Sequence, residues 1–199
     1  MPIFQLGKTL LVYRFSLLPA EVPSLLERHR ARYPGGSKIE QGGKKLKADG
    51  FPEIASINFV EDVHNWSMMR RNAERVQKVG GSEIAAKLRA ASQQIDDGDE
   101  PQAIQTLCRI PHLGISYASK IARFLDPEKC VILDSVIRER LGYPQNAGGY
   151  AAFLQDCKDT LEVLKASPLL DSQCRAGLRV CDVEAVFFMK AKELSNVSP

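Results

Sequence analysis

A four-residue link, Pro111-His112-Leu113-Gly114, separates two helical patterns near the middle of the chain. So short a link with Pro and Gly is typical of a hairpin of two helices, here predicted over 102–125. The first N–H groups of the second helix then point outward and, with the helix dipole, can bind a phosphate. A plain helical hairpin that binds nothing is the alternative interpretation.

The second helix, expected over 115–125, carries two different faces. Small and aliphatic residues form its apolar face: Ile115, Ala118, Ile121, Ala122 and Leu125. Ser116, Lys120 and Arg123 recur at helical spacing and predict a polar, basic face. Beside a backbone phosphate site, Lys120 and Arg123 could bind one strand of DNA. The predicted DNA contacts are Pro111, His112, Leu113, Gly114, Ser116, Lys120 and Arg123.

Asp134 follows the apolar run Val131–Leu133, where a new helix is expected to begin. In one interpretation Asp134 is only the N-cap of that helix. In the other it also faces a cleft, where a carboxylate can stabilise an oxocarbenium-like sugar or activate water.

The stretch from Ile110 to Leu141 resembles the helix-hairpin-helix superfamily of DNA glycosylases. Gly114 matches the second glycine of the family's hairpin, and Asp134 matches the catalytic aspartate. Members that also cut the strand carry a lysine where this chain has Ser116, eighteen residues before Asp134. In this respect the chain is similar to the adenine-mismatch branch. A group of short bacterial relatives is similar in other residues, namely Ala118-Ser119-Lys120, Phe124, Asp126-Pro127 and Ile132 with Asp134. The chain departs from the family at His112, which replaces the first hairpin glycine.

Helical patterns dominate the chain and predict an all-α fold, with a short strand allowed within 10–15. The resemblance implies that this fold is the two-layer, glycosylase-like one, as a single domain over 1–199. It also implies a monofunctional DNA glycosylase of base excision repair, which hydrolyses the N-glycosidic bond of a nucleotide flipped out of double-stranded DNA. Asp134 would be catalytic, and without a lysine at position 116 no lyase activity is expected. The base could be damaged, mismatched or modified, including a modified base of phage DNA in a defence role.

By order along the chain, the end of an early helix would supply the base pocket or the wedge. The residues there are Asn65, Trp66, Met69, Arg70 and Arg71. Trp66, the only tryptophan, could stack on a base. Packing within the protein is the alternative for Trp66, and a solvated surface is the alternative for the two arginines.

Residues 34–50 contain five glycines and are predicted to form a loop. Its lysines, Lys38, Lys44, Lys45 and Lys47, suggest a flexible arm that neutralises phosphates. A solvated surface loop without a partner is the alternative.

The 199 residues carry a net charge of +3, compatible with a nucleic-acid partner but too small to identify one. No apolar run approaches the roughly 20 residues of a membrane helix, and we expect no signal peptide, no membrane contact and a monomer in the bacterial cytoplasm. The five cysteines are scattered, and none follows Cys181 to complete an iron–sulfur loop. We therefore expect no metal, cluster or other cofactor.

Two other functions fit the same residues. The first is a DNA-binding helix-hairpin-helix protein without catalysis, which would not need a carboxylate at Asp134. The second is a helical protein–protein module in which the hairpin is only a turn.

Overall fold

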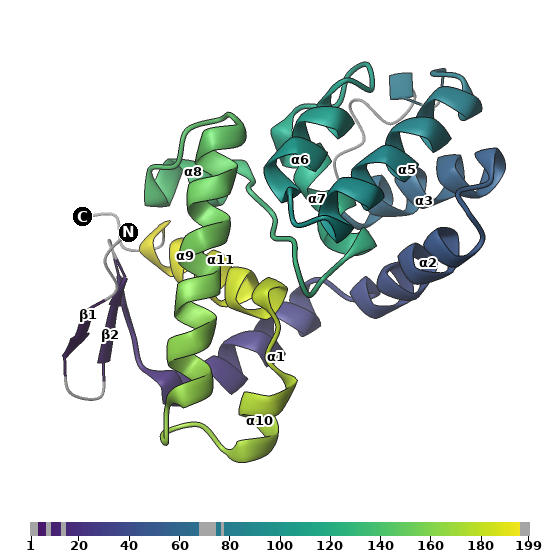
Figure 1. The fold of residues 1–199 in the computed structure, drawn as a ribbon. Coiled ribbons are helices and arrows are strands. Elements are labelled where there is room, and N and C mark those ends of the chain that lie inside the picture. The colour runs from purple at the N-terminus through teal and green to yellow at the C-terminus, as the bar shows by residue number, and fades with distance from the viewer. Residues whose placement is uncertain (1–3, 7–8, 13–14, 68–74, 77, 196–199) are drawn as a thin grey trace. The chain divides into compact units, whose positions relative to one another are not determined.

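The computed structural model describes residues 4–6, 9–12, 15–67, 75–76 and 78–195, and these are mainly helical, as predicted (Figure 1). Contacts within the chain form two compact units where the sequence analysis expects one domain. We call residues 33–134 the central unit, and residues 1–32 with 135–199 the terminal unit. Each unit has buried aliphatic residues of its own, which is why the chain divides in this way.

The central unit contains five of the described helices: α2 (Gly36–Ala48), α3 (Glu53–Trp66), α5 (Gly81–Asp96), α6 (Glu100–Cys108) and α7 (Ile115–Leu125). Helix α7 is at the middle of this unit, because α2, α3, α5 and α6 all pack against it. Every residue of α7 from Tyr117 to Leu125 is buried. The bounds of α7 are those that the apolar pattern predicts.

The terminal unit begins with a small antiparallel sheet of β1 (Phe4–Leu6), β2 (Thr9–Val12) and β3 (Phe15–Leu17), in that order. In the register, Gln5 pairs with Leu10, and Leu11 pairs with Ser16. The single short strand predicted within 10–15 is thus replaced by three shorter ones. A 3-10 turn and five helices follow: η1 (Pro19–Glu21), α1 (Val22–Arg32), α8 (Ser135–Leu141), α9 (Ala147–Ala166), α10 (Ser172–Gly177) and α11 (Val180–Ser195). Helices α1, α8 and α9 pack against α11.

The prediction of a glycine-rich loop over 34–50 is wrong, because 36–48 form helix α2. Ile39, Gly43 and Leu46 lie on its buried face. A Cβ at Gly43 would lie 2.2 Å from the carbonyl oxygen of Phe124, so glycine is what lets α2 approach α7. This glycine therefore serves helix packing rather than a turn, and the lysines of 34–50 belong to a helix and its ends rather than to a flexible arm.

Candidate functional site

The hairpin between α6 and α7 has an exposed edge and a buried anchor. Pro111, His112 and Gly114 are exposed, whereas Leu113 is buried and donates its N–H to the carbonyl of Ile110 at 3.1 Å. His112 has φ +69°, a left-handed conformation that favours glycine. The resembled family has a glycine at this position, and here a histidine adopts a conformation that suits one.

The first turn of α7 leaves backbone donors available. Gly114 is the N-cap, and its carbonyl accepts hydrogen bonds from the N–H groups of Tyr117 at 2.9 Å and Ala118 at 3.0 Å. Within the described part of the chain, the N–H groups of Ile115 and Ser116 have no acceptor. Two free amides beside an exposed hairpin are compatible with the predicted contact to a phosphate.

The predicted basic face of α7 is wrong for Arg123, which is buried and pairs with Glu40 of α2 at 2.7 Å. The geometry is that of an ion pair rather than of a well-aligned hydrogen bond, and the Arg123 guanidinium also lies over the ring of Phe124 at 4.5 Å. The physical reason is that α2 packs on this side of α7 and supplies the opposite charge. Arg123 therefore joins α7 to α2 within the central unit and is buried rather than part of an exposed basic face.

Lys120 also differs from its predicted role as an exposed DNA contact. Its side chain is 5% exposed, and its Nζ donates to Ser116 Oγ at 3.1 Å, one helical turn earlier. The same ammonium lies 5.6 Å from the ring centroid of Tyr117. Lys120 thus contacts Ser116 from the interior of the central unit. Of these two side chains, Ser116 is the one that is partly exposed.

A buried hydroxyl fastens the run before Asp134 to the first turns of α7. Ser119 Oγ accepts the N–H of Leu133 at 3.1 Å and donates to the carbonyl of Ser116 at 3.1 Å. Asp134 follows Leu133 directly, is half-buried, and immediately precedes α8, which is the position of an N-cap. The structure therefore holds the backbone that leads into Asp134 against the part of α7 that follows the hairpin.

His64 of α3 is a buried residue of this region that the sequence analysis did not select. Its side chain is 2% exposed, and its ring meets that of Tyr117 edge to face at 4.7 Å between centroids. Burial, and secondly the positive charge of Lys120, lowers the pKa of His64 to about 4, so the imidazole is neutral near pH 7. Helical spacing after Phe59, Val60 and Val63 was the available signal for burial, but it could not reveal Lys120 as a neighbour.

The predicted base pocket or wedge is only partly described. Trp66 lies edge to face against Phe124 at 4.8 Å and near Tyr33 at 5.8 Å, so it packs on the end of α7 away from the hairpin. Asn65 is exposed. Met69, Arg70 and Arg71 lie outside the described residues. The structure thus brings together the hairpin, Ser116 and the run before Asp134, but it does not place Trp66 beside them.

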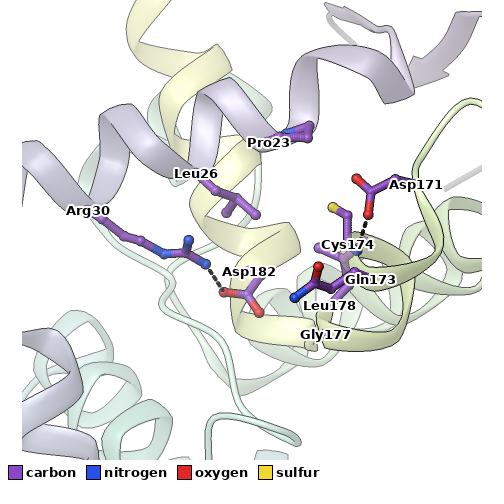
Figure 2. A pocket seen from close by; sticks show the side chains of 9 residues that line it. All are labelled: Pro23, Leu26, Arg30, Asp171, Gln173, Cys174, Gly177, Leu178 and Asp182. Atoms are coloured by element: carbon purple, nitrogen blue, oxygen red, sulfur yellow. Dashed lines mark hydrogen bonds and ion pairs between the residues drawn. The ribbon is translucent and has the colours of Figure 1, made fainter.

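The terminal unit contains a separate pocket of about 370 Å³ (Figure 2). It is lined by Pro23, Leu26, Arg30, Asp171, Gln173, Cys174, Gly177, Leu178 and Asp182. Asp182 pairs with Arg179 at 3.1 Å and with Arg30 at 3.9 Å, and burial raises the pKa of the Cys174 thiol. None of the predicted site residues lies in this pocket.

No protein-family model, curated protein or solved structure matches this chain. No helix among the described residues is long and apolar enough to cross a membrane. The same residues hold no group of three or more His, Cys, Asp or Glu side chains that could bind a metal ion.

Proposed function

We propose that this chain is a monofunctional DNA glycosylase that hydrolyses the N-glycosidic bond of an altered nucleotide flipped out of double-stranded DNA. The observation that carries the proposal is the bridge made by Ser119 between Leu133 and Ser116. This bridge fastens the backbone that leads into Asp134 to the first turns of α7, which supports a role for the Asp134 carboxylate beside the predicted phosphate contact of the hairpin.

The hairpin would hold the DNA backbone. Its exposed edge and the free amides of Ile115 and Ser116 offer donors to a phosphate oxygen, and they carry no preference for a base. Because Lys120 and Arg123 are buried, the grip depends on backbone amides and the Ser116 hydroxyl rather than on surface cations of α7. Other basic side chains of the chain would supply the longer-range attraction to DNA.

Asp134 would carry the chemistry. As the base leaves, positive charge develops on the deoxyribose, and a nearby carboxylate lowers the energy of that state. Water then adds to the sugar and leaves an abasic site. Ser116 occupies the position of the lysine in members that cut the strand, so we expect the strand to remain intact.

A DNA-binding protein without catalysis is the second candidate. It is favoured by the position of Asp134 directly before α8, where a carboxylate serves as an N-cap without any chemistry. In this case the hairpin would still bind DNA, and no altered base would be removed.

The two candidates are separated by incubating the protein with duplexes that each contain one altered base. The panel includes deaminated, oxidised and alkylated bases, mismatched adenine and glucosylated cytosine. The glycosylase predicts one or more duplexes that break only after alkali treatment, because alkali cleaves at abasic sites. Binding to DNA without any alkali-sensitive product across the panel would favour the second candidate.

A further inference from the structure

The pocket of the terminal unit has an apolar wall (Figure 2). Leu26 of α1 and Leu178, the residue that follows α10, line this wall, and both are buried. The volume of about 370 Å³ lies near the lower end of the roughly 300–1,000 Å³ that is typical of small-molecule sites. The pocket therefore suits a small molecule with an apolar part.

The polar side of the pocket carries an excess of positive charge. The Asp182 side chain of α11 is 9% exposed, and its Oδ2 accepts the backbone N–H of Arg179 at 3.0 Å and the Nε–H of the same residue at 3.1 Å. The Nη2 atom of Arg30 lies 3.9 Å from Asp182 Oδ1. Two guanidinium groups thus share one buried carboxylate, which holds them by its charge and leaves one positive charge in excess.

Two donor groups at this side are available to a ligand. At 3.9 Å the Arg30 guanidinium is beyond hydrogen-bond distance of Asp182, and it makes no hydrogen bond to the described residues. The side-chain amide of Gln173 makes none within the described part of the chain either. Figure 2 shows both side chains directed toward Asp182. The Arg30 side chain is 71% exposed, so a ligand can reach it, and a planar guanidinium matches the geometry of a carboxylate.

The other polar groups of the lining add no second positive charge. Burial raises the pKa of the Cys174 thiol, the charge of Asp171 adds to this effect, and that of Arg30 opposes it, so the thiol is neutral near pH 7. Asp171 lies on the other side of the pocket from Arg30 (Figure 2), where its Oδ1 accepts the N–H of Cys174 at 2.8 Å. The lining thus favours a single negative charge at the Arg30 side, which matches a carboxylate better than a phosphate with about two charges.

We propose that this pocket binds a small monocarboxylate with an apolar body. The carboxylate accepts hydrogen bonds from Arg30 and Gln173, and the body packs against Leu26 and Leu178. The inference is independent of the proposed function, because neither the hairpin nor Asp134 lines the pocket.

The test is calorimetric titration of the full chain with hexanoate, and with hexanamide and hexylamine as neutral and cationic probes of the same length. Hexanoate should bind at least about tenfold more tightly than either probe, because hydrogen bonds from Arg30 to a carboxylate are charge-assisted. R30M should remove this preference. R32M is the matched control: Arg32 is an exposed arginine of the same helix that does not line the pocket, and its loss should leave the preference unchanged.

A second variant fills the pocket. Gly177 lines it, and a Cβ added there would meet no atom within 4 Å, so G177L should fold normally. The leucine side chain should occupy part of the volume and weaken hexanoate binding at least about tenfold. Thermal unfolding without hexanoate shows whether R30M, R32M and G177L keep the stability of the wild type.

Alkylation adds a readout at the pocket itself. Cys174 lines the pocket and is half-buried, and Cys108 of the central unit, which is half-buried as well, is the matched control. Saturating hexanoate should slow the reaction of Cys174 with iodoacetamide, followed by mass spectrometry, and leave that of Cys108 unchanged. Alkylation of Cys174 at an unchanged rate with hexanoate bound would place the ligand outside the pocket and overturn the inference.

The titrations can overturn the inference independently of alkylation. No measurable binding of hexanoate, equal affinities for hexanoate and hexanamide, or a preference for hexanoate that folded R30M retains would each do so.

Discussion

Two buried polar clusters, one in each unit, differ in whether their hydrogen bonds are complete. In the terminal unit, Tyr143 donates to Asp156 at 2.6 Å, and Thr160 donates to the carbonyl of Asp156 at 2.7 Å. In the central unit, Ser116 keeps an unused donor, and His64 Nε2 has no partner among the described residues. A polar cluster whose hydrogen bonds are complete (a closed cluster) stabilises the fold. A cluster that keeps donors or acceptors without a partner (an open cluster) is a candidate for a functional site.

Helix α2 packs closely against α7 in the central unit, and one added methyl group at Gly43 should disrupt this packing. G43A should destabilise the central unit by about 3 kcal/mol, because the added Cβ meets the Phe124 carbonyl. G42A is the matched control: its Cβ would lie 4.0 Å from the Phe59 ring, and it should stabilise α2 slightly. Denaturant unfolding measures both effects. Equal stability of the two variants would contradict the packing role of Gly43.

The open cluster should also have a characteristic dependence on pH. Because the pKa of His64 falls to about 4 in the folded state, the unfolded chain binds a proton first as the pH falls below about 6.5. The contribution of the neutral His64 to the free energy of unfolding is therefore fully present above pH 6.5. This contribution decreases by about 3 kcal/mol as the pH falls toward 4, and it does not change further below that pH.

Urea unfolding at a series of pH values tests this dependence. H64F should remove this part of the pH dependence. K120M should raise the pKa of His64 in the folded state, because the charge of Lys120 is the second cause of its lowered pKa. The pH range over which stability decreases should therefore end at a higher pH than in the wild type. The wild type and H64F could instead lose the same free energy of unfolding between pH 6.5 and 4. That result would contradict the lowered pKa of His64.

The closed cluster should affect stability without affecting function. Y143F removes the hydrogen bond to the buried Asp156 and should cost about 2 kcal/mol of stability. Burial and the Asp156 carboxylate raise the pKa of Tyr143, so the phenol stays protonated and this cost should not vary between pH 6 and 9. Calorimetry measures the loss of stability, and duplex binding should match the wild type. Weaker DNA binding by folded Y143F would break the contrast between the clusters.

The smallest expected effect on stability belongs to Ser116. S116A removes the half-buried hydroxyl that accepts a hydrogen bond from the buried Lys120 and should lower the free energy of unfolding by about 1 kcal/mol. The same variant is expected to lose duplex affinity. S119A is the informative comparison, because its buried hydroxyl joins Leu133 to Ser116 and its loss should cost stability. A larger loss of stability in S116A than in S119A would reverse this assignment.

The local patterns of the sequence predicted much of the fold but little of the side-chain environment. The bounds of α7 agree with its apolar stripe, because that stripe is set by residues three and four apart. The same spacing predicted an exposed position for Arg123. This prediction failed because the partner of Arg123, Glu40, lies far away in the sequence, where helical spacing cannot indicate a contact. Counting glycines predicted a loop where Gly43 serves a contact with α7.

The candidate site shows the same limit. The hairpin and Asp134 were identified from the order of residues, and the structure describes both. The link between them depends on Ser119, whose hydroxyl bridges two segments that only the fold brings together. The burial of Lys120, which donates to Ser116 from inside the central unit, is likewise a property that spacing alone does not reveal.

In the proposed reaction, the charge of Asp134 stabilises the developing sugar cation, and its ability to cap α8 does not contribute. Asparagine caps a helix about as well as aspartate but carries no charge. The decisive measurement is single-turnover excision by D134N on a duplex that the wild type processes, with binding to the same duplex measured in parallel. D171N, which changes the N-cap of α10 in the same way, is the matched control. We predict a loss of at least about a hundredfold in excision rate with unchanged binding for D134N, and wild-type rates for D171N. Excision by D134N at the wild-type rate would contradict the catalytic role and leave Asp134 as a cap.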